Sequence, residues 1–224
     1  LRASKKLGLQ NVLIQLDISM GLANKVSVPF SDKLFFSYPN TNPEIKNQHI
    51  VGPFIRRHVV DESKVTKVGN FTSDLPIIFV TGGGTGSADI NKLIWESLSE
   101  LTTMANIVHM TGESKGDPSK ASKNYHQISY LDPDNYYHWL TKAKLTIGRA
   151  GMGFFSDCIG YRKVAIVLPI LKGHQEDNAK YFADADAIVI PKDASKVNKE
   201  WILKTVTELL GDEDRRITLS KNIG

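Results

Sequence analysis

The sequence predicts an α/β fold in which a parallel sheet carries helices on both faces. Two observations support this prediction. Strand-like and helix-like segments alternate at short spacing from residue 76 to about residue 210. The strand-like segments, such as "PIIFV" and "KVAIVLP", are continuous apolar runs, which is typical of strands buried on both faces. We therefore expect one Rossmann-like sheet in this part of the chain.

The first 75 residues show weaker patterns. Their first segment is typical of the end of a helix, because basic residues lie near its end and Gly8 provides a stop signal. The polar segment 61–75 predicts a linker. The expected elements are a helix end at 1–7, a strand at 11–16, a helical piece at 21–25 and a strand at 33–37.

From residue 76 the predicted elements follow one another closely. The segment "DPDNYYHWLTKA" is expected to form a helix with Asp132 as its N-cap and Pro133 at its first position. The other helices are expected at about 88–101, 153–160, 175–183 and 195–210. The strands are expected at 76–80, 106–112, 126–131, 144–148, 163–169 and 187–190.

The composition is that of an ordinary globular protein. The length of 224 residues allows one large domain or two small ones, with 41% hydrophobic and 23% charged residues. The single cysteine, Cys158, excludes an internal disulfide and is typical of a reducing compartment. Neither a membrane-spanning run nor a secretory signal is expected. Because the first residue is Leu1, we expect the chain to be a fragment.

The charge and the metal-ligating residues narrow the classes of partner. The net charge of +4 and the pI near 9.0 favour anionic partners such as phosphates or an anionic membrane surface, although a lysine-rich solvated surface explains them equally well. Basic and aromatic residues are not interleaved, so no nucleic-acid partner is expected. The six histidines are scattered, so we expect no metal and no cofactor.

The first candidate site is the glycine-rich turn in "FVTGGGTGSADIN", between a predicted strand and a predicted helix. Ligands of open parallel sheets bind at the carboxyl ends of the strands. Here glycines leave the backbone free to approach an anion, and the helix start offers unpaired N–H groups. The turn lacks the lysine of a Walker loop and the acid of a dinucleotide fingerprint. A tight turn without a ligand is the alternative.

The second candidate site is the turn that follows the strand ending at Gly148. Gly151 leaves a helix N-terminus free, and Arg149 lies beside it with a guanidinium fork that suits phosphate oxygens. Asp157 is expected in the first or second turn of this helix, where a carboxylate can accept hydrogen bonds from both hydroxyls of a ribose. The alternative for Asp157 is an acid that only compensates the helix dipole.

The third candidate site lies in "LPILKGHQEDNAKYF", after another predicted strand. His174 and Gln175 are expected to offer hydrogen bonds to a hydroxylated ligand, and Asn178 lies one turn further along. A histidine on such a loop can equally lie on the surface without a ligand. The aromatic group at 136–139 is interpreted as core and helix surface rather than as a stacking platform.

Together the three segments resemble the C-terminal half of glycosyltransferase family 28, which has the GT-B fold. That family shows G-G-S-x-G in the first turn, R-S-G-x-x-x-x-S-E in the second and H-Q-x-x-N-A at the sugar-binding helix. This chain has G-G-G-T-G at 82–86, R-A-G through S-D at 149–157 and H-Q-E-D-N-A at 174–179. Upstream, "GLANK" and "VGPFIRRHV" resemble the family segment G-L-[AT]-N-[KR] and its hinge V-G-N-P-V-R, which places Arg56 on the hinge arginine.

The resemblance implies a domain organisation and a set of donor-binding residues. Residues 1–51 would be the C-terminal part of the N-terminal acceptor domain, 52–75 the interdomain connection and 76–224 a complete UDP-sugar donor domain. The donor diphosphate would lie beside Gly83, Gly84, Thr85, Gly86, Gly151 and Met152, with Arg56 as a charge partner. The uracil would meet the backbone of Leu131, the ribose Asp157, and the sugar hydroxyls Gln175 with His174, while Asn178 would support that helix.

Three departures from the family pattern concern both substrates. Gly84 replaces the family serine, so a hydroxyl donor is lost unless Thr85 replaces it. Asp157 replaces the family glutamate and is one methylene shorter. The family segment H-E-Q-N falls on Ile14-Gln15-Leu16-Asp17, which removes a polar group on the acceptor side. Donor binding is therefore better supported than the family's own acceptor.

The resemblance implies transfer of a sugar, N-acetylglucosamine first of all, from a UDP-sugar to a lipid-linked acceptor in peptidoglycan-like synthesis. It also implies a cytoplasmic enzyme that is peripheral on the inner face of the cell membrane. We expect the fragment to be inactive by itself. The alternatives are the donor-binding subunit of a split glycosyltransferase with an N-terminal-half partner chain, a sugar-nucleotide epimerase, and a non-enzymatic nucleotide-binding module.

Overall fold

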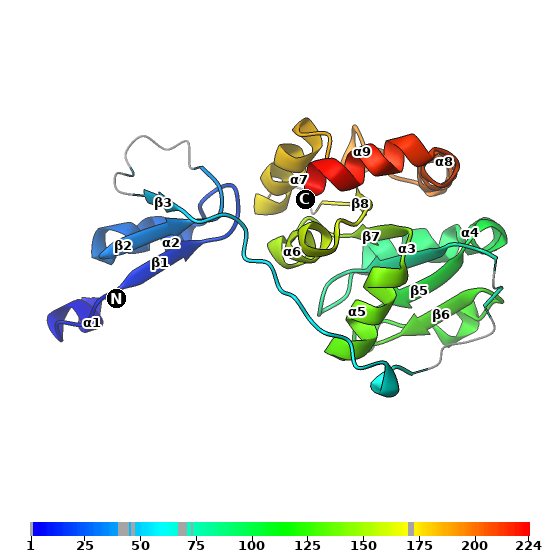
Figure 1. Cartoon of the computed structure of the whole chain (residues 1–224), viewed down its shortest axis with the longest axis horizontal. Coiled ribbons are helices and arrows are strands. Elements are labelled where there is room, and N and C mark those ends of the chain that lie inside the picture. Colours follow the sequence, from blue (N-terminus) through cyan, green and yellow to red (C-terminus); the bar gives the residue numbers. More distant parts are fainter. Residues whose placement is uncertain (1, 40–44, 46–47, 67–70, 73, 170–172) are drawn as a thin grey trace.

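The computed structural model describes residues 2–39, 45, 48–66, 71–72, 74–169 and 173–224, and it contains two parallel sheets (Figure 1). The smaller sheet has the order β1-β2-β3. The larger sheet has the order β6-β5-β4-β7-β8, which confirms the predicted α/β fold. The strands are β1 (Val12–Gln15), β2 (Lys33–Phe36), β3 (Gln48–Ile50), β4 (Ile77–Thr81), β5 (Asn106–Met110), β6 (Tyr125–Ile128), β7 (Leu145–Gly148) and β8 (Ala165–Val167).

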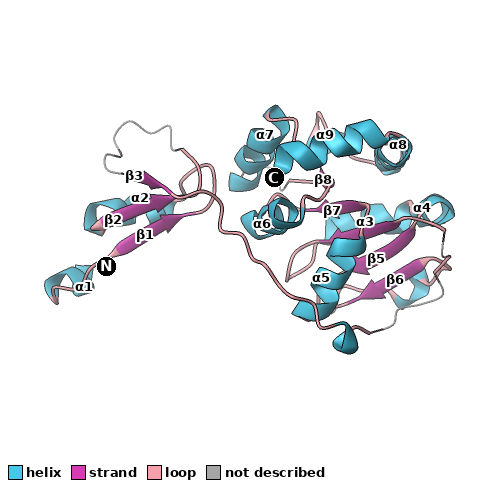
Figure 2. Ribbon diagram, viewed as in Figure 1, coloured by secondary structure: helices cyan, strands magenta, loops and turns pink. Residues whose placement is uncertain are grey.

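Helices flank the strands of the larger sheet (Figure 2). Their bounds are α1 (Arg2–Lys6), α2 (Leu22–Ser27), α3 (Ala88–Glu96), α4 (Leu98–Met104), α5 (Pro133–Lys142), α6 (Met152–Tyr161), α7 (His174–Asp184), α8 (Lys199–Gly211) and α9 (Glu213–Ile223). Short 3-10 helices lie at Val28–Phe30, Glu62–Lys64, Pro118–Lys120 and Ala194–Lys196. Asp132 caps α5 as predicted, because its side chain accepts from the Asn135 N–H.

The larger sheet is buried on both faces. Ile78 and Val80 of β4 point to a core formed with α3, α4, α8 and α9. Phe79, between them, points to the opposite face and packs with Leu140 of α5. All three β4 side chains are fully buried. This alternation explains why the strand is a continuous apolar run, since both of its faces meet helices.

Three predicted elements differ in the structure. The segment 187–190 forms only a bridge between Val189 and Ile166, because it is confined between the turn that ends α7 and Pro191, which lacks an N–H donor. The helix expected through residue 101 breaks at Ser97, whose hydroxyl donates to the Leu93 carbonyl. The helix expected from residue 195 begins at Lys199. The sequence patterns also missed β3 and α9.

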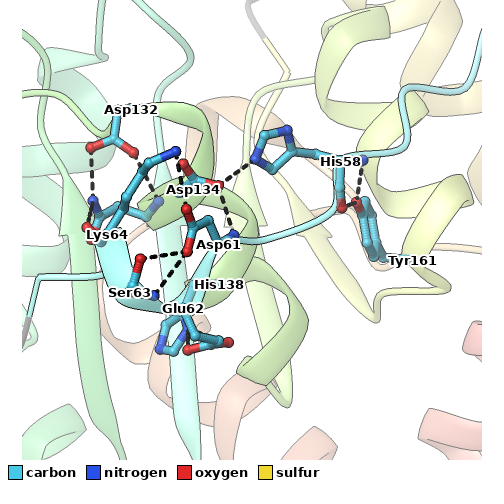
Figure 3. A network of polar contacts seen from close by, with 10 residues as sticks. His58, Asp61, Glu62, Ser63, Lys64, Asp132, Asp134, His138 and Tyr161 are labelled. Carbon is cyan, nitrogen blue, oxygen red and sulfur yellow. Dashed lines mark hydrogen bonds and ion pairs between the residues drawn. The ribbon is translucent and has the colours of Figure 1, made fainter.

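The connection after β3 is attached to the larger domain (Figure 3). His58 Nε2 lies 2.7 Å from Asp134 Oδ1 of α5. The His58 N–H donates to the Tyr161 hydroxyl, and that hydroxyl donates to the His58 carbonyl at 3.1 Å. Glu62 and His138 add a contact of 2.9 Å. The segment from His58 to Glu62 is therefore held against α5 and α6.

The part of the chain that carries the smaller sheet, β1 to β3, is called the small lobe here. Helix α7 makes a second link between the small lobe and the domain that carries the larger sheet. Tyr38, just after β2, lies edge-on to Tyr181 and Phe182, with ring centroids 5.2 Å and 5.8 Å apart. Phe182 in turn stacks on Phe155 of α6, with centroids 4.3 Å apart. These aromatic contacts place α7 between the small lobe and the helix that follows β7.

A buried polar network fixes the far side of the first glycine-rich turn. The Tyr125 hydroxyl accepts from Trp95 and lies 3.0 Å from His109 Nδ1, while His109 Nε2 lies 3.0 Å from Asn91 Oδ1. Asn91 then donates to the carbonyls of Thr111 and Lys115. Burial lowers the pKa of His109 from 6.5 to about 3, so the ring is neutral at physiological pH.

We expect His109 to make the folded state acid-sensitive. Between pH 6.5 and about 3 the unfolded chain binds a proton at this histidine and the folded chain does not, so stability falls as pH falls through this window. Replacing His109 with Gln, which retains one acceptor and one donor, should reduce the pH dependence by about 1.4 kcal/mol per pH unit. Urea unfolding of both proteins across this pH range tests this. The same change of unfolding free energy with pH in both proteins would contradict it.

Candidate functional site

The two glycine-rich turns leave the sheet at adjacent positions. Thr81, at the end of β4, pairs with Gly148, at the end of β7. The turn before α3 and the turn before α6 therefore start side by side on the carboxyl edge of the sheet. A cavity of about 440 Å³ is lined by both turns, including Gly83, Gly86 and Gly151, and by Gln175 of α7.

Two glycines of the first turn, Gly86 and Gly84, differ in whether the fold has room for a side chain at their position. Gly86 has φ +69°, and a Cβ there would lie 2.0 Å from the Thr111 carbonyl oxygen. Its identity is thus required by the fold. Gly84 meets no described atom within 4 Å of the position of a Cβ, and it lines a second cavity. The space in front of Gly84 is open to a ligand.

The start of α6 differs from the start of α3 in its hydrogen bonds. Ser87 caps α3, with its hydroxyl accepting from the Ile90 N–H. Gly151 is the N-cap of α6, and among the described residues no side chain caps this helix. The first turn of α6 also contains no acidic residue. Its N–H groups and the positive end of its dipole are therefore available to an anion in the larger cavity.

The second cavity has a volume of about 280 Å³ and adjoins the first, because Gly83, Gly153 and Phe154 line both. Its wall includes Leu131, which follows β6, and Asp157. The ring of Tyr130 also lines it and is 64% exposed, so an aromatic face lies at the cavity surface. The two cavities together provide adjacent spaces for a planar ring and for an anion.

Asp157 lies in the second cavity wall but is itself only 1% exposed. Its Oδ2 accepts from Arg56 at 3.1 Å and from the Tyr136 hydroxyl at 3.0 Å. Its Oδ1 accepts from the Tyr137 hydroxyl at 3.0 Å. Burial raises the pKa of Asp157, while Arg56 and the two tyrosines act in the opposite direction. The carboxylate is therefore held in one orientation by three donors.

The two arginines of the predicted site have different surroundings. Arg56 is 63% exposed and donates to Asp157 and, at 3.4 Å, to the Gly153 carbonyl, so it lies at the junction of the cavities. Arg149 lines the larger cavity, so binding of a phosphate by its fork stays a prediction. Its guanidinium already bonds to Ser87 at 2.6 Å, to Asp89 at 2.8 Å and to the carbonyl of Leu168. This arginine joins the start of α3 to the end of β8.

The third segment contributes α7. Gln175 lines the larger cavity, and Asn178 is completely buried one turn further along. The side chain of His174 lies outside the described part of the structure. Thr85 and Met152 are on the two turns, with Thr85 in the wall of the larger cavity. The structure thus places the predicted donor-binding residues in or beside the walls of the two cavities, Arg149 included, apart from the buried Asn178 and the undescribed His174 side chain.

The sequence patterns did not identify Tyr136 and Tyr137 as part of this site. They were interpreted as core and helix surface, yet both hydroxyls bond to Asp157. Burial raises the pKa of Tyr137 to about 12, with the charge of Asp157 adding to this effect. A buried tyrosine hydroxyl needs a partner, which was the signal available in the sequence.

The described ranges contain neither a metal-binding cluster nor a membrane-spanning helix. No group of three or more His, Cys, Asp or Glu side chains could hold a metal ion there. Within the same ranges, every helix is too short or too polar to cross a membrane. Cys158 is buried, and burial raises the pKa of its thiol to about 12, so it is unreactive at neutral pH.

Two bacterial transferases are similar to this chain in sequence. UDP-N-acetylglucosamine--N-acetylmuramyl-(pentapeptide) pyrophosphoryl-undecaprenol N-acetylglucosamine transferase 3 of Bacillus cereus is 30% identical over 210 residues, which are 90% of this chain and 58% of that protein. The Geobacillus kaustophilus transferase of the same name, without a number, is 28% identical over 217 residues, which are 93% of this chain and 60% of that protein. The chain thus spans less than two thirds of the length of these relatives.

Solved structures share the fold at low sequence identity. The crystal structure of Acinetobacter baumannii MurG matches 99% of this chain and 63% of its own, with a TM-score of 0.72 and 20% identity. A putative UDP-N-acetylglucosamine 2-epimerase from Listeria monocytogenes matches 99% of this chain and 64% of its own, with a TM-score of 0.70 and 11% identity. The calicheamicin glycosyltransferase CalG4 matches with a TM-score of 0.68 and 10% identity. The architecture is therefore the GT-B type, as the sequence resemblance implied.

The family assignment rests on the larger domain. Its glycine-rich turns and the H-Q-x-x-N-A helix lie around one pair of joined cavities. Residues 77–223 match the glycosyltransferase family 28 C-terminal domain, and the chain belongs to this family.

Proposed function

We propose that this chain binds a UDP-sugar, UDP-N-acetylglucosamine first of all, in the two joined cavities. One observation carries the proposal: the uncapped start of α6 faces an open cavity beside the glycine-rich turn of β4. The names of the similar bacterial transferases support this donor. In the whole enzyme, the donor sugar would pass to a lipid-linked acceptor in peptidoglycan synthesis.

In this proposal each part of the donor has a separate place. The diphosphate lies between the first turn, from Gly83 to Gly86, and the start of α6 at Gly151 and Met152. The uracil edge meets the backbone of Leu131, beside the exposed ring of Tyr130. The sugar lies in the larger cavity near Gln175. Negative charge that grows on the departing UDP is stabilised there by the dipole of α6.

Ribose recognition by Asp157 requires one rearrangement. Both carboxylate oxygens already accept hydrogen bonds from the protein, so a ribose hydroxyl must share or displace one of these donors. Arg56 is the donor that can leave, because its side chain is exposed and the tyrosines are held in α5. Once it leaves Asp157, its guanidinium can reach the diphosphate. We propose that Arg56 exchanges partners in this way when the donor binds.

The small lobe supports a role in a larger acceptor domain. Within the described residues, the outer edge of β1 pairs with no strand, and Val12, Ile14 and Leu16 are about half exposed on one face of it. Parallel sheets are normally covered on both faces. We propose that residues 1–51 belong to the acceptor domain, that 52–75 form the connection, and that further chain, in the same or a partner polypeptide, completes the sheet at β1.

The same proposal places the enzyme at the cytoplasmic face of the membrane, where a lipid-linked acceptor is reached. It distinguishes a transferase from an epimerase by one observation, since an epimerase converts UDP-N-acetylglucosamine into an isomeric UDP-sugar without an acceptor. A donor half should bind UDP-N-acetylglucosamine and leave it intact until the front half and the lipid acceptor are both added. Epimerisation of UDP-N-acetylglucosamine by the chain alone would contradict the transferase assignment.

Gln175 provides a test of where the sugar lies. Replacing Gln175 with Ala should leave UDP affinity within about twofold and weaken UDP-N-acetylglucosamine binding by about 5- to 10-fold, as expected for one lost hydrogen bond. The control is Lys180→Ala, on the same helix, where an exposed lysine pairs with Asp184. Calorimetric titration of both ligands tests this. Equal losses for UDP and UDP-N-acetylglucosamine would place the sugar elsewhere.

A further inference from the structure

A completely buried amide joins the two lobes at the donor site. Asn178 of α7 accepts from the Ile18 N–H at 3.0 Å through Oδ1. Its Nδ2 donates to Asp17 Oδ1 at 2.8 Å and to the Ala150 carbonyl at 3.1 Å. Asp17 and Ile18 lie in the loop after β1, whereas Ala150 immediately precedes Gly151, the N-cap of α6.

Burial and hydrogen bonding determine what Asn178 can do. Its side chain is 0% exposed, and an asparagine amide has only two N–H donors, both of which are used here. It therefore has no donor left for a sugar hydroxyl. Its bonds instead connect a loop of the small lobe to the turn that presents the α6 N-terminus.

The small-lobe side of this connection is itself fixed. Gln15 is 2% exposed, and its Nε2 donates to the carbonyls of Asp17 and Ser19 at 2.7 Å and 2.9 Å. Asn24 Nδ2 donates to Gln15 Oε1 at 2.6 Å, which orients the glutamine amide. Gln15 and Asn24 therefore hold the conformation of the loop that carries Asp17 through bonds within the small lobe, independently of α7.

The donor-site side is held from two directions. Arg149, the residue before Ala150, bonds through its side chain to Ser87 at the start of α3 and to the Leu168 carbonyl at the end of β8. Asn178 fixes Ala150 itself to α7 and to the small lobe. Because no described side chain caps α6, the place of its first N–H groups depends on how this turn is held. The Asn178 amide therefore connects the position of the small lobe to the position of these N–H groups.

We propose that Asp17 and Asn178 are positioning residues that hold the α6 N-terminus in place for the donor diphosphate. They thereby couple donor affinity to the placement of the small lobe. This inference rests on the proposed function, because it concerns the same anion site. It predicts that the bond between Asp17 and Asn178 affects ligands with a diphosphate and not those that lack one.

The test uses Asp17→Ala and its conservative counterpart Asp17→Asn, each titrated with UDP and with uridine. Asp17→Ala removes one of the two acceptors of the Asn178 amide and should raise the Kd for UDP by about 5- to 10-fold, the effect of one buried hydrogen bond. Uridine binding should stay within about twofold, since uridine does not reach the α6 N-terminus. Asp17→Asn retains an acceptor oxygen and should restore UDP affinity. Amide exchange at residues 151–154 should accelerate in Asp17→Ala only.

Each contrary outcome has a distinct meaning. If the unaltered chain binds no UDP, the proposed function fails and this inference fails with it. If the unaltered chain binds UDP and Asp17→Ala binds it equally well, only the positioning role is overturned. Equal losses for UDP and uridine, or no recovery in Asp17→Asn, would also overturn it, because the effect would then be a general loss of structure.

Discussion

Replacing Gly86 with alanine is expected to destabilise the folded state by about 3–5 kcal/mol and to lower the thermal midpoint by roughly 10 °C. A Cβ at this position would lie 2.0 Å from the Thr111 carbonyl oxygen and 2.7 Å from the Gly112 Cα, and φ is +69°. Both neighbours are backbone atoms, so the strand end or the turn must move. Thermal and urea unfolding measure the effect.

Gly84 is the matched control for this substitution. It lies two residues away in the same turn, but no described atom would come within 4 Å of a Cβ there. Gly84→Ala should therefore change the free energy of unfolding by less than about 1 kcal/mol. It should still weaken UDP, because Gly84 lines the cavity that adjoins α6. Similar destabilisation by both variants would contradict the distinction between a fold glycine and a ligand-facing glycine.

Replacing Asp157 with alanine is expected to weaken UDP by about 30-fold or more, since a charged acceptor of two ribose hydroxyls is lost. The same change leaves the hydroxyls of Tyr136 and Tyr137 without their partner and should lower stability by about 2–3 kcal/mol. The expected loss of stability is modest because Arg56 is 63% exposed and solvent screens its charge. Calorimetry with UDP and urea unfolding separate the two effects.

Two controls distinguish ribose binding from loss of structure. Tyr137→Phe removes one donor to Asp157 but keeps the carboxylate, so UDP affinity should stay within about threefold. Asp184→Ala removes an exposed carboxylate that pairs only with Lys180 among the described contacts, and it should change neither property. If Asp157→Ala folds and binds UDP as tightly as the original chain, Asp157 does not contact the ribose.

The sequence patterns predicted the order of elements in the larger domain because local signals and burial agree there. The apolar runs of β4 and β7 are buried on both faces, and Asp132 caps its helix with its own side chain. The patterns failed where contacts between distant parts of the chain, or bonds of a buried side chain, determine whether a strand forms or a helix ends. Nothing local marks β3, which exists because its backbone pairs with β2. The break at Ser97 likewise depends on a side-chain bond within the buried helix.

The candidate site was predictable in part for a similar reason. Glycine-rich turns after strands mark a place where backbone approaches a ligand, and the sheet register brought both turns together. The partners of long side chains could not be predicted. The bonds of Arg149 to Ser87 and Asp89, beside the predicted phosphate site, were not expected. Asp157 was expected to have a carboxylate available to a ribose, but the carboxylate already accepts hydrogen bonds from three donors, two of them from α5.

If the turns before α3 and α6 receive one nucleoside diphosphate, the backbone amides of both turns should respond when UDP is titrated into the protein and amide chemical shifts are recorded. We expect saturable shifts of the amide signals of Gly83 to Gly86, Leu131, Gly151 and Met152. The signals of residues around a separate cavity, lined by Lys192, Lys204 and Arg215, should shift less. Shifts confined to that other cavity, or none at the two turns while UDP is bound, would contradict this binding mode.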